Sequence, residues 1–200
     1  MKKMPTIFKR EFTDEFGNRK KIKTLNEINP ECQWVFDREG YATEKIDGTC
    51  CLIENNVLFA RYDFKPGRTL PEGAIPCQEK GDPITGHFPH WVPTADNPNY
   101  KWYNASFHPD VENYENGTYE LIGKHFNSNP YNLTTDIFVA HGKKILDIDD
   151  RSYEGINNFL KEHEIEGIVF YHPDGRMAKI KRSDFGFEWP IKKEKTNENV

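Results

Sequence analysis

The sequence predicts an α+β domain in which short strands outnumber helices. Two β-branched and apolar runs, residues 50–53 and 57–62, flank the turn signal Glu54-Asn55-Asn56 and predict a β-hairpin. Residues 153–163 carry apolar side chains at helical spacing and predict one helix. Further short apolar runs predict strands over residues 117–123, 137–140, 166–170 and 177–181.

Three other stretches have less regular patterns. Residues 7–25 alternate in charge and predict one or two surface strands with a turn at Phe16-Gly17-Asn18. Trp34-Val35-Phe36 is interpreted as a core strand. Residues 65–110 are dense in Pro, Gly and Asn, which predicts mostly loop with short strands, and their many aromatic side chains predict that this region is packed.

Length and composition favour one domain over residues 1–190, followed by a flexible tail over residues 191–200. No apolar run is long enough for a transmembrane helix, and the first residues lack the apolar region of a signal peptide. We therefore expect a cytoplasmic protein without membrane contact, and on the same ground we expect its four cysteines to be reduced thiols. The cysteines are Cys32, Cys50, Cys51 and Cys77.

The net charge of −5 does not suit a protein that binds nucleic acid non-specifically. A nucleic-acid partner would have to be held by a local basic cluster. His87, His141 and His172 have no metal-ligand spacing in the sequence, so we expect them to be structural or surface residues.

Residues 43–51, Thr-Glu-Lys-Ile-Asp-Gly-Thr-Cys-Cys, contain a recognisable chemical unit around Lys45. A neutral lysine amine is a good nucleophile, but a lysine with its ordinary pKa of about 10.4 is almost wholly protonated at neutral pH. Desolvation or nearby cations would have to remove that proton. Asp47 and Gly48 predict a tight turn that delivers Lys45 into a pocket. The motif alone also fits a solvated surface lysine.

Five elements follow one another in a fixed order along the chain: Lys45-x-Asp47-Gly48, Arg61, Glu120, Glu166-Gly167 and Lys179-x-Lys181. The strand over residues 177–181 places Lys179 and Lys181 on one face. This ordered set resembles the covalent nucleotidyltransferase superfamily of polynucleotide ligases and RNA capping enzymes. Phe138 lies where that superfamily has an aromatic strand.

A closer resemblance is to the vertebrate-type 5′-to-3′ RNA ligase family. It rests on residues 43–51 together with Gly86-His87-Phe88-Pro89-His90-Trp91-Val92-Pro93, Glu120-Leu121-Ile122-Gly123, Asn129-Pro130-Tyr131 and Ile165-Glu166-Gly167-Ile168-Val169. The resemblance implies an ATP-grasp-like nucleotidyltransferase (adenylation) domain, built from two packed, mostly antiparallel sheets with flanking helices. Compared with that family, the chain is shorter at its C-terminus.

The resemblance also implies a mechanism. Lys45 would attack the α-phosphate of ATP and form a lysyl–AMP phosphoramidate. AMP would then pass to the 5′-phosphate of an RNA, and a 3′-hydroxyl would displace it to seal the strand. Lys179 and Lys181 would hold the α-phosphate and lower the pKa of Lys45, and Glu166 would bind Mg²⁺, with Mn²⁺ as an alternative ion.

The remaining residues would bind the nucleotide in the family's manner, Asp47 and Gly48 as part of the lysine motif. Glu120 and Arg61 would contact the ribose, Phe138 would stack on adenine, and Glu44 would lie at the adenine edge. Phe138 as an ordinary core residue and Glu120 as a salt-bridge partner are alternatives. The sequence alone assigns no chemical role to Asn127, Asn129 or Tyr131.

Three functions remain open from the sequence. The first is an ATP-dependent RNA ligase, a monomer acting on RNA with 5′-phosphate and 3′-hydroxyl ends, as in RNA repair. The second is a DNA ligase or a GTP-using capping enzyme. The Lys-x-Asp-Gly motif does not distinguish these enzymes from an RNA ligase. The third is a catalytically silent module that binds nucleotide or RNA.

Overall fold

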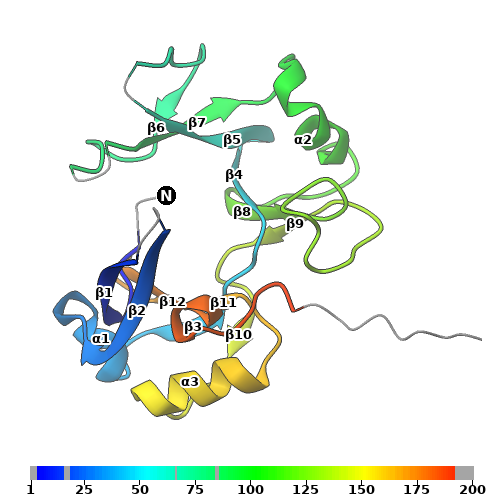
Figure 1. Cartoon of the computed structure of the whole chain (residues 1–200). Helices are drawn as coiled ribbons and strands as arrows, with labels where there is room; N and C mark the ends of the chain where they lie inside the picture. The colour runs from blue at the N-terminus through cyan, green and yellow to red at the C-terminus, as the bar shows by residue number, and fades with distance from the viewer. Residues whose placement is uncertain (1–3, 16–18, 66, 84–85, 192–200) are drawn as a thin grey trace, which may run out of the picture. The chain divides into compact units, whose positions relative to one another are not determined.

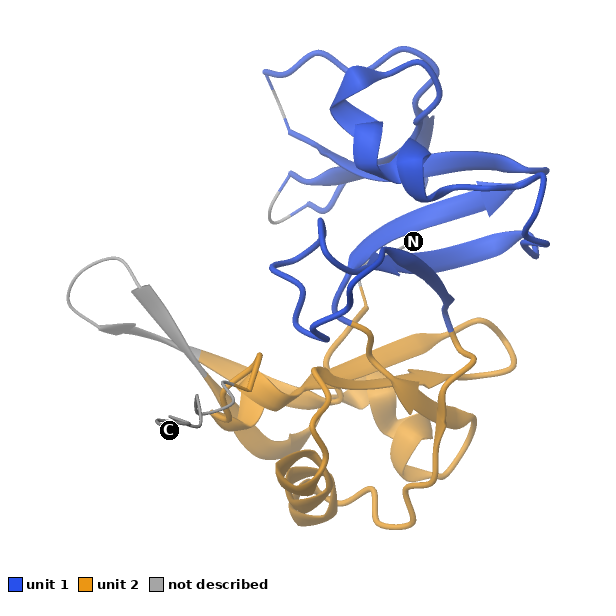
Figure 2. Cartoon of the chain, turned by 90° about the vertical axis from the view of Figure 1, so that its right-hand side faces the viewer, with its two compact units in different colours: residues 1–3, 47–141 blue, residues 4–46, 142–200 orange. Residues whose placement is uncertain are grey.

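The computed structural model describes residues 4–15, 19–65, 67–83 and 86–191. The chain divides into two compact units (Figure 2). Unit 1 holds the described part of residues 47–141, and unit 2 holds the described parts of residues 4–46 and 142–200. The border between Ile46 and Asp47 falls inside the Lys-x-Asp-Gly motif, so Lys45 belongs to unit 2 and Gly48 to unit 1.

Unit 1 is built on a six-stranded antiparallel sheet with the strand order β6-β7-β5-β4-β8-β9 (Figure 1). Its strands are β4 (Thr49–Glu54), β5 (Val57–Phe64), β6 (Ile75–Pro76), β7 (Phe88–Pro93), β8 (Gly117–Ile122) and β9 (Ile137–Ala140). The predicted hairpin is confirmed as β4 and β5. Asn55 and Asn56 turn it with φ of 51° and 58°, the left-handed conformation that two-residue hairpin loops require.

Period-two alternation divides the side chains of this sheet between two faces. One face packs into a core with residues from the connecting segments. Its buried members are Cys51, Ile53, Leu58, Tyr119, Leu121 and Phe126. The connecting segment that follows β7 contains η2 (Pro98–Tyr100) and α2 (Lys101–Ser106). Tyr103 and Phe107 from α2 and its end pack against this core, so the expectation that residues 65–110 contain packed aromatics is confirmed.

Unit 2 contains a four-stranded antiparallel sheet with the order β10-β3-β11-β12 and a separate two-stranded ribbon, β1-β2. The strands are β1 (Phe8–Glu15), β2 (Arg19–Ile28), β3 (Tyr41–Glu44), β10 (Ile145–Leu146), β11 (Gly167–Tyr171) and β12 (Met177–Lys181). The ribbon confirms two strands over residues 7–25, but Ile7 and Phe8 at its start are buried in the unit 2 core and do not lie at the surface. The turn expected at residues 16–18 lies outside the described residues, as does most of the expected tail.

Helix α3 (Tyr153–Glu162) confirms the one helix that the sequence predicted. The Ser152 side chain accepts a hydrogen bond from the Gly155 N–H and caps its first turn. Ile156 and Leu160 from α3 are fully buried and pack in one core with Ile168 and Phe170 of β11. The core therefore fixes one face of the four-stranded sheet against α3 (Figure 1) and leaves the other face to the site residues.

The prediction of a core strand at Trp34-Val35-Phe36 is wrong. These residues form α1 (Gln33–Phe36), which follows the 3₁₀ turn η1 (Pro30–Cys32). Asn29 caps that turn by accepting from the Glu31 N–H, and Pro30 provides the fixed φ of a first helical residue. Three apolar residues are too few to distinguish a strand from a helix. The strand that precedes Lys45 is β3, and η3 (Arg182–Phe185) follows β12.

The described elements thus form an α+β protein with antiparallel sheets, as predicted. Among the described residues, none of the helices has both the length and the apolar character needed to cross a membrane.

Candidate active site

The three lysines of the predicted site come together on one face of the four-stranded sheet of unit 2. Thr43 of β3 lies opposite Val169 of β11, which lies opposite Lys179 of β12. In the next row, the Lys45 N–H donates to the Gly167 carbonyl at 2.9 Å, and Gly167 lies opposite Lys181. The register confirms that Lys179 and Lys181 share a face, and it brings Lys45 beside them.

Glu166 is the carboxylate at the centre of this lysine cluster. Its Oε2 lies 2.5 Å from Lys45 Nζ, and its Oε1 lies 2.8 Å from Lys181 Nζ. Glu166 itself is 6% exposed. A buried carboxylate is stable when opposite charges satisfy both oxygens, and here the two lysines do so. The motif Glu166-Gly167 therefore holds the Lys45 amine in one position.

Lys45 and Lys181 each form an ion pair with Glu166, whereas Lys179 forms none with a described residue of this cluster. The pKa of Lys179 is lowered from 10.5 to about 8, chiefly by burial and in smaller part by the charges of Lys181, Lys45 and Arg10, while Glu166 opposes the shift. Arg10 is paired with Asp184, and the three lysines around Glu166 leave a surplus of positive charge. Such a cluster suits an anionic phosphate group.

The glycine of Glu166-Gly167 is required by the packing of β11 on β12. A Cβ at Gly167 would collide with the carbonyl of Ile180 and would lie 2.9 Å from the Cα of Lys181. Real Cβ atoms essentially never come this close to backbone. The motif glycine therefore permits the close approach that puts Lys181 next to Glu166.

Two side chains to which the sequence analysis assigned no role hold the residues after Lys45 in place within unit 1. The Asp47 N–H donates to the Tyr131 hydroxyl at 2.7 Å. The Asn127 side-chain amide donates to Asp47 Oδ1 at 3.0 Å and to the Gly48 carbonyl at 2.6 Å. Asn127 has φ of 44° within a run of left-handed residues, a turn that aims its amide at the motif. Only the family resemblance had pointed to this stretch.

Gly48 is also fixed by sterics. A Cβ there would lie 2.5 Å from Cγ2 of Ile122 and 2.8 Å from the carbonyl of Leu121. The loop of the lysine motif therefore packs directly on β8, the strand that carries Glu120. The glycines of the two motifs, Gly48 and Gly167, each permit a close backbone approach within their own unit.

Arg61 and Glu120, the predicted ribose ligands, lie in one row across the sheet of unit 1. Cys50 of β4 lies directly opposite Glu120 of β8, and the hairpin register, in which Cys51 lies opposite Ala60, sets Cys50 beside Arg61 of β5. Trp91 lies opposite Arg61, and Val139 lies opposite Glu120. Because directly paired residues project from the same face, this row presents all five side chains on the face opposite the unit 1 core.

Glu120 is paired with His141, which the sequence analysis expected to be a structural or surface residue. His141 Nε2 lies 3.1 Å from Glu120 Oε1, and His141 Nδ1 lies 2.8 Å from the Thr118 hydroxyl oxygen. Burial raises the pKa of the Cys50 thiol to about 12, with the Glu120 charge adding to the rise. All four cysteines are free thiols, as expected.

Phe138 does not share the face of Glu120. It lies opposite Leu121, and its ring makes edge contacts with Phe107, Tyr114 and Tyr119 in the unit 1 core. This placement favours the alternative that Phe138 is an ordinary core residue over stacking on adenine. The physical reason is the two-residue period of β9, which turns Val139 rather than Phe138 toward Glu120.

Glu44 is also placed apart from the lysine face. It lies opposite Ile168 in the register of β3 and β11, so it projects from the other side of the sheet than Thr43. Its Oε2 lies 3.4 Å from Lys144 Nζ. The structure therefore groups Lys45, Glu166, Lys179 and Lys181 in unit 2, groups Arg61 and Glu120 in unit 1, and leaves Glu44 and Phe138 outside both groups.

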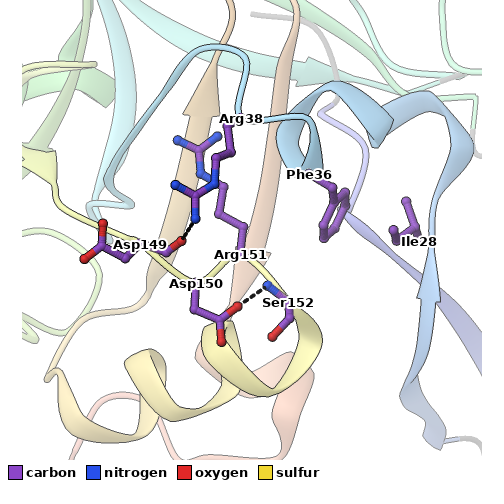
Figure 3. A pocket seen from close by; sticks show the side chains of 7 residues that line it. All are labelled: Ile28, Phe36, Arg38, Asp149, Asp150, Arg151 and Ser152. Atoms are coloured by element: carbon purple, nitrogen blue, oxygen red, sulfur yellow. Dashed lines mark hydrogen bonds between the residues drawn. The ribbon is translucent and has the colours of Figure 1, made fainter.

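A surface pocket of about 630 Å³ in unit 2 contains none of the predicted site residues (Figure 3). It is lined by Ile28, Phe36, Arg38, Asp149, Asp150, Arg151 and Ser152. Its arginines are used structurally: Arg38 donates to the Asp149 carbonyl, and Arg151 donates to the carbonyls of Val35 and Gly40. The pocket is thus a packing feature near the start of α3.

Comparison with known proteins gives the class to which these features point. A family model described as RNA ligase 1 matches residues 108–199, which include Glu120, Glu166, Lys179 and Lys181. The chain is therefore similar to RNA ligase 1 proteins, in agreement with the resemblance of its motifs.

The relatives are individual proteins named RNA ligase 1. Those of Pongo abelii and Rattus norvegicus are each 26% identical over 267 aligned positions, which cover 95% of this chain and 82% of the relative. RNA ligase 1 of Danio rerio is 26% identical over 271 positions, covering 94% of this chain and 82% of the relative. The similarity therefore extends over both units.

Proposed function

We propose that this protein is an ATP-dependent RNA ligase with a covalent nucleotidyltransferase fold that adenylates itself on Lys45. The observation that carries the proposal is the lysine cluster, in which the Lys45 amine is held 2.5 Å from Glu166 and beside two further lysines. A fixed amine surrounded by cations fits attack on an anionic phosphorus centre. The similarity to RNA ligase 1 proteins supports an RNA substrate.

In the proposed first step, the Lys45 nitrogen forms a bond to the α-phosphorus of ATP. The bond from that phosphorus to the bridging oxygen of the β-phosphate breaks, and pyrophosphate leaves. Lys45 must lose a proton before it attacks, and Glu166 Oε2 is the acceptor to which it is already hydrogen-bonded. Lys179 and Lys181 would hold the α-phosphate oxygens and stabilise their negative charge in the transition state.

In the later steps, the α-phosphorus would pass from Lys45 to the 5′-phosphate of an RNA. A 3′-hydroxyl would then attack that 5′-phosphate, release AMP and form the phosphodiester bond. Arg61 and Glu120 remain the proposed ligands of the ribose, since the sheet register sets them on one face of unit 1. Asn127 and Tyr131 are proposed positioning residues, because they bond to Asp47 and Gly48 rather than to a reacting group.

Glu166 fits the proposed Mg²⁺ as a single carboxylate ligand. Mg²⁺ usually binds through one or two carboxylates together with waters and substrate phosphates, and Glu166 offers hard oxygen donors. Both of its oxygens are paired with lysines, so one lysine would have to be exchanged for the ion. A bound Mg²⁺ would supply neutralisation of the phosphate charges.

Incubation with ATP labelled at the α-phosphorus tests the proposal. The wild type should take up a label that is lost in acid, as a phosphoramidate is, and Lys45→Ala should take up none. Lys161→Ala, a change of an exposed lysine on α3, is the matched control and should label like the wild type. Label that persists in Lys45→Ala, or a wild type that binds ATP without labelling, would refute the proposal.

The labelled protein also separates the alternative enzymes. Addition of 5′-phosphorylated RNA should discharge the label and join it to the RNA end, whereas a DNA ligase would discharge preferentially on 5′-phosphorylated DNA. Unlabelled GTP should compete poorly with ATP; efficient competition would favour a capping-type enzyme.

A further inference from the structure

Three side chains of different chemistry come together on the face of the unit 1 sheet that carries Arg61 and Glu120, opposite the unit 1 core. Cys50 comes from β4, Glu120 from β8, and His141 follows directly after β9. One ligand atom from each, the sulfur, a carboxylate oxygen and an imidazole nitrogen, lies within 4.8 Å of the other two. Glu120 follows Cys50 by 70 positions and precedes His141 by 21, so no metal-binding motif of short spacing identifies the group in the sequence.

The polar atoms of this group are incompletely satisfied. Glu120 Oε2 is buried and has no hydrogen-bond partner among the described residues. The side chains of Glu120 and His141 are only 14% and 15% exposed. A buried, unpaired carboxylate oxygen costs free energy, and a bound cation would remove that cost.

The histidine is already oriented as a metal ligand would be. The Thr118 hydroxyl lies 2.8 Å from His141 Nδ1, which leaves Nε2 directed at Glu120. Metal-binding histidines commonly use the second ring nitrogen for such a hydrogen bond, because it fixes the tautomer and the plane of the ring.

We propose that Cys50, Glu120 and His141 form a binding site for a thiophilic divalent ion of the Zn²⁺ type. Thiolate, imidazole and carboxylate are the ligands that Zn²⁺ takes, with bond lengths of about 2.0–2.3 Å, and ligand atoms grouped this closely can share one ion. The sulfur ligand disfavours Mg²⁺, which prefers oxygen alone. The Cys50 thiol would release its proton to solvent on binding. Three protein ligands leave a fourth position for water.

The ion would regulate the proposed ligase, a consequence that rests on the proposed function. Glu120 cannot bind the ribose of ATP and a metal ion with the same carboxylate in the same geometry. Zn²⁺ bound here should therefore compete with nucleotide. Metal binding itself needs no ATP, so it can be measured whether or not the protein proves to be a ligase.

The test uses Co²⁺ as a spectroscopic stand-in for Zn²⁺, with the full chain and no nucleotide. Co²⁺ should produce a sulfur-to-cobalt charge-transfer band that one equivalent of Zn²⁺ removes. Cys50→Ser should abolish the band. His141→Ala should weaken binding by about tenfold or more, the loss typical of disturbed metal sites. Cys77→Ser is the matched control, since Cys77 is a free thiol of unit 1 outside the group, and should keep the band.

A second measurement on the wild type guards against a variant that fails to fold. Zn²⁺ should slow alkylation of Cys50, read by peptide mass, and leave Cys77 alkylation unchanged. The proposal is overturned if the band survives in Cys50→Ser or is lost in Cys77→Ser alone. It is also overturned if Cys50 is alkylated equally with and without Zn²⁺. Inhibition of labelling by Zn²⁺ in Cys50→Ser as strongly as in the wild type would overturn the regulatory consequence alone.

Discussion

The ammonium nitrogen of Lys45 lies 2.5 Å from Oε2 of Glu166, while the other oxygen of that carboxylate lies 2.8 Å from the ammonium nitrogen of Lys181. One buried carboxylate thus separates two lysines that would otherwise repel each other. The contact between Lys45 and Glu166 spans 121 positions of the sequence, and the second contact of Glu166 extends the connection to Lys181.

Glu166→Gln should be less stable than the wild type, because it keeps the shape of the side chain but removes the charge between two lysines. Loss of one partner from a fully buried ion pair costs about 3–5 kcal/mol, and the partial exposure of Lys45 and Lys181 reduces the expected loss to about 2 kcal/mol. Urea unfolding measures it. Glu164→Gln, a change of an exposed neighbour, should have no such effect. Equal stability of Glu166→Gln and the wild type would contradict the ion-pair arrangement.

Lys179→Met should stabilise the protein at neutral pH while impairing adenylation. The pKa of Lys179 is about 8 in the folded state and 10.5 as the ordinary value, so folding disfavours its charged form. That cost is present in full below about pH 8 and is relieved as the pH rises toward 10.5. The thermal stability of Lys179→Met should therefore exceed that of the wild type at neutral pH and converge with it as the pH rises.

The control for this pH dependence is Lys161→Met on the exposed side of α3. Its stability difference from the wild type should not change through the same pH range. A constant difference for Lys179→Met, or a variant less stable than the wild type at neutral pH, would show that Lys179 carries no desolvation cost.

Much of this site could be predicted from the sequence because two short-range rules set it. The two-residue period of β12 places Lys179 and Lys181 on one face, and the register of antiparallel strands brings Lys45 beside them. The ion pairs of Glu166 with Lys45 and Lys181 were not predicted, because the sequence analysis assigned Glu166 to Mg²⁺. The order of the motifs then provided the resemblance that the comparisons support.

What the sequence did not yield depends on contacts between distant segments. The contact between His141 and Glu120 could not be predicted from the sequence. It depends on the pairing of β8 with β9, which the residues next to His141 do not indicate. Asn127 acts on Asp47 over 80 positions through a turn whose shape no local pattern dictates. A shift of one residue in the pairing of β9 with β8 would move Phe138 to the other face of the sheet, and the position of Phe138 in a motif does not determine that pairing to one residue.

Gly48→Ala should destabilise unit 1 and reduce labelling of Lys45 together. The added Cβ would lie 2.8 Å from the Leu121 carbonyl, so the loop that carries the lysine motif would have to move away from β8. Gly81→Ala is the matched control, since its Cβ would lie 3.4 Å or more from its neighbours in the same unit and its backbone is not left-handed. Thermal unfolding of both variants checks the prediction, which fails if Gly48→Ala is as stable as Gly81→Ala.

Asn127→Ala should slow labelling of Lys45 with little change in nucleotide affinity, because Asn127 positions the motif loop without a role in binding ATP. It removes hydrogen bonds to Asp47 and Gly48, each worth about 0.5–1.5 kcal/mol. Single-turnover labelling at saturating and limiting ATP separates the two effects. A variant with weakened affinity and an unchanged rate at saturation would place Asn127 in direct contact with the nucleotide instead.

Phe138→Leu should change stability and Arg61→Ala should change nucleotide affinity, because the two side chains lie on opposite faces of the unit 1 sheet. Phe138→Leu should lower the free energy of unfolding by about 1 kcal/mol through lost core packing and leave nucleotide affinity unchanged. Arg61→Ala should weaken nucleotide binding severalfold at little cost in stability, since Arg61 is partly exposed and its Asp63 contact is long, at 3.8 Å. Equilibrium binding of a non-cleavable α,β-methylene ATP and thermal unfolding measure both effects. If Phe138→Leu lost affinity but kept its stability, the ring would stack on adenine after all, and β9 would have to present it on the face of Glu120.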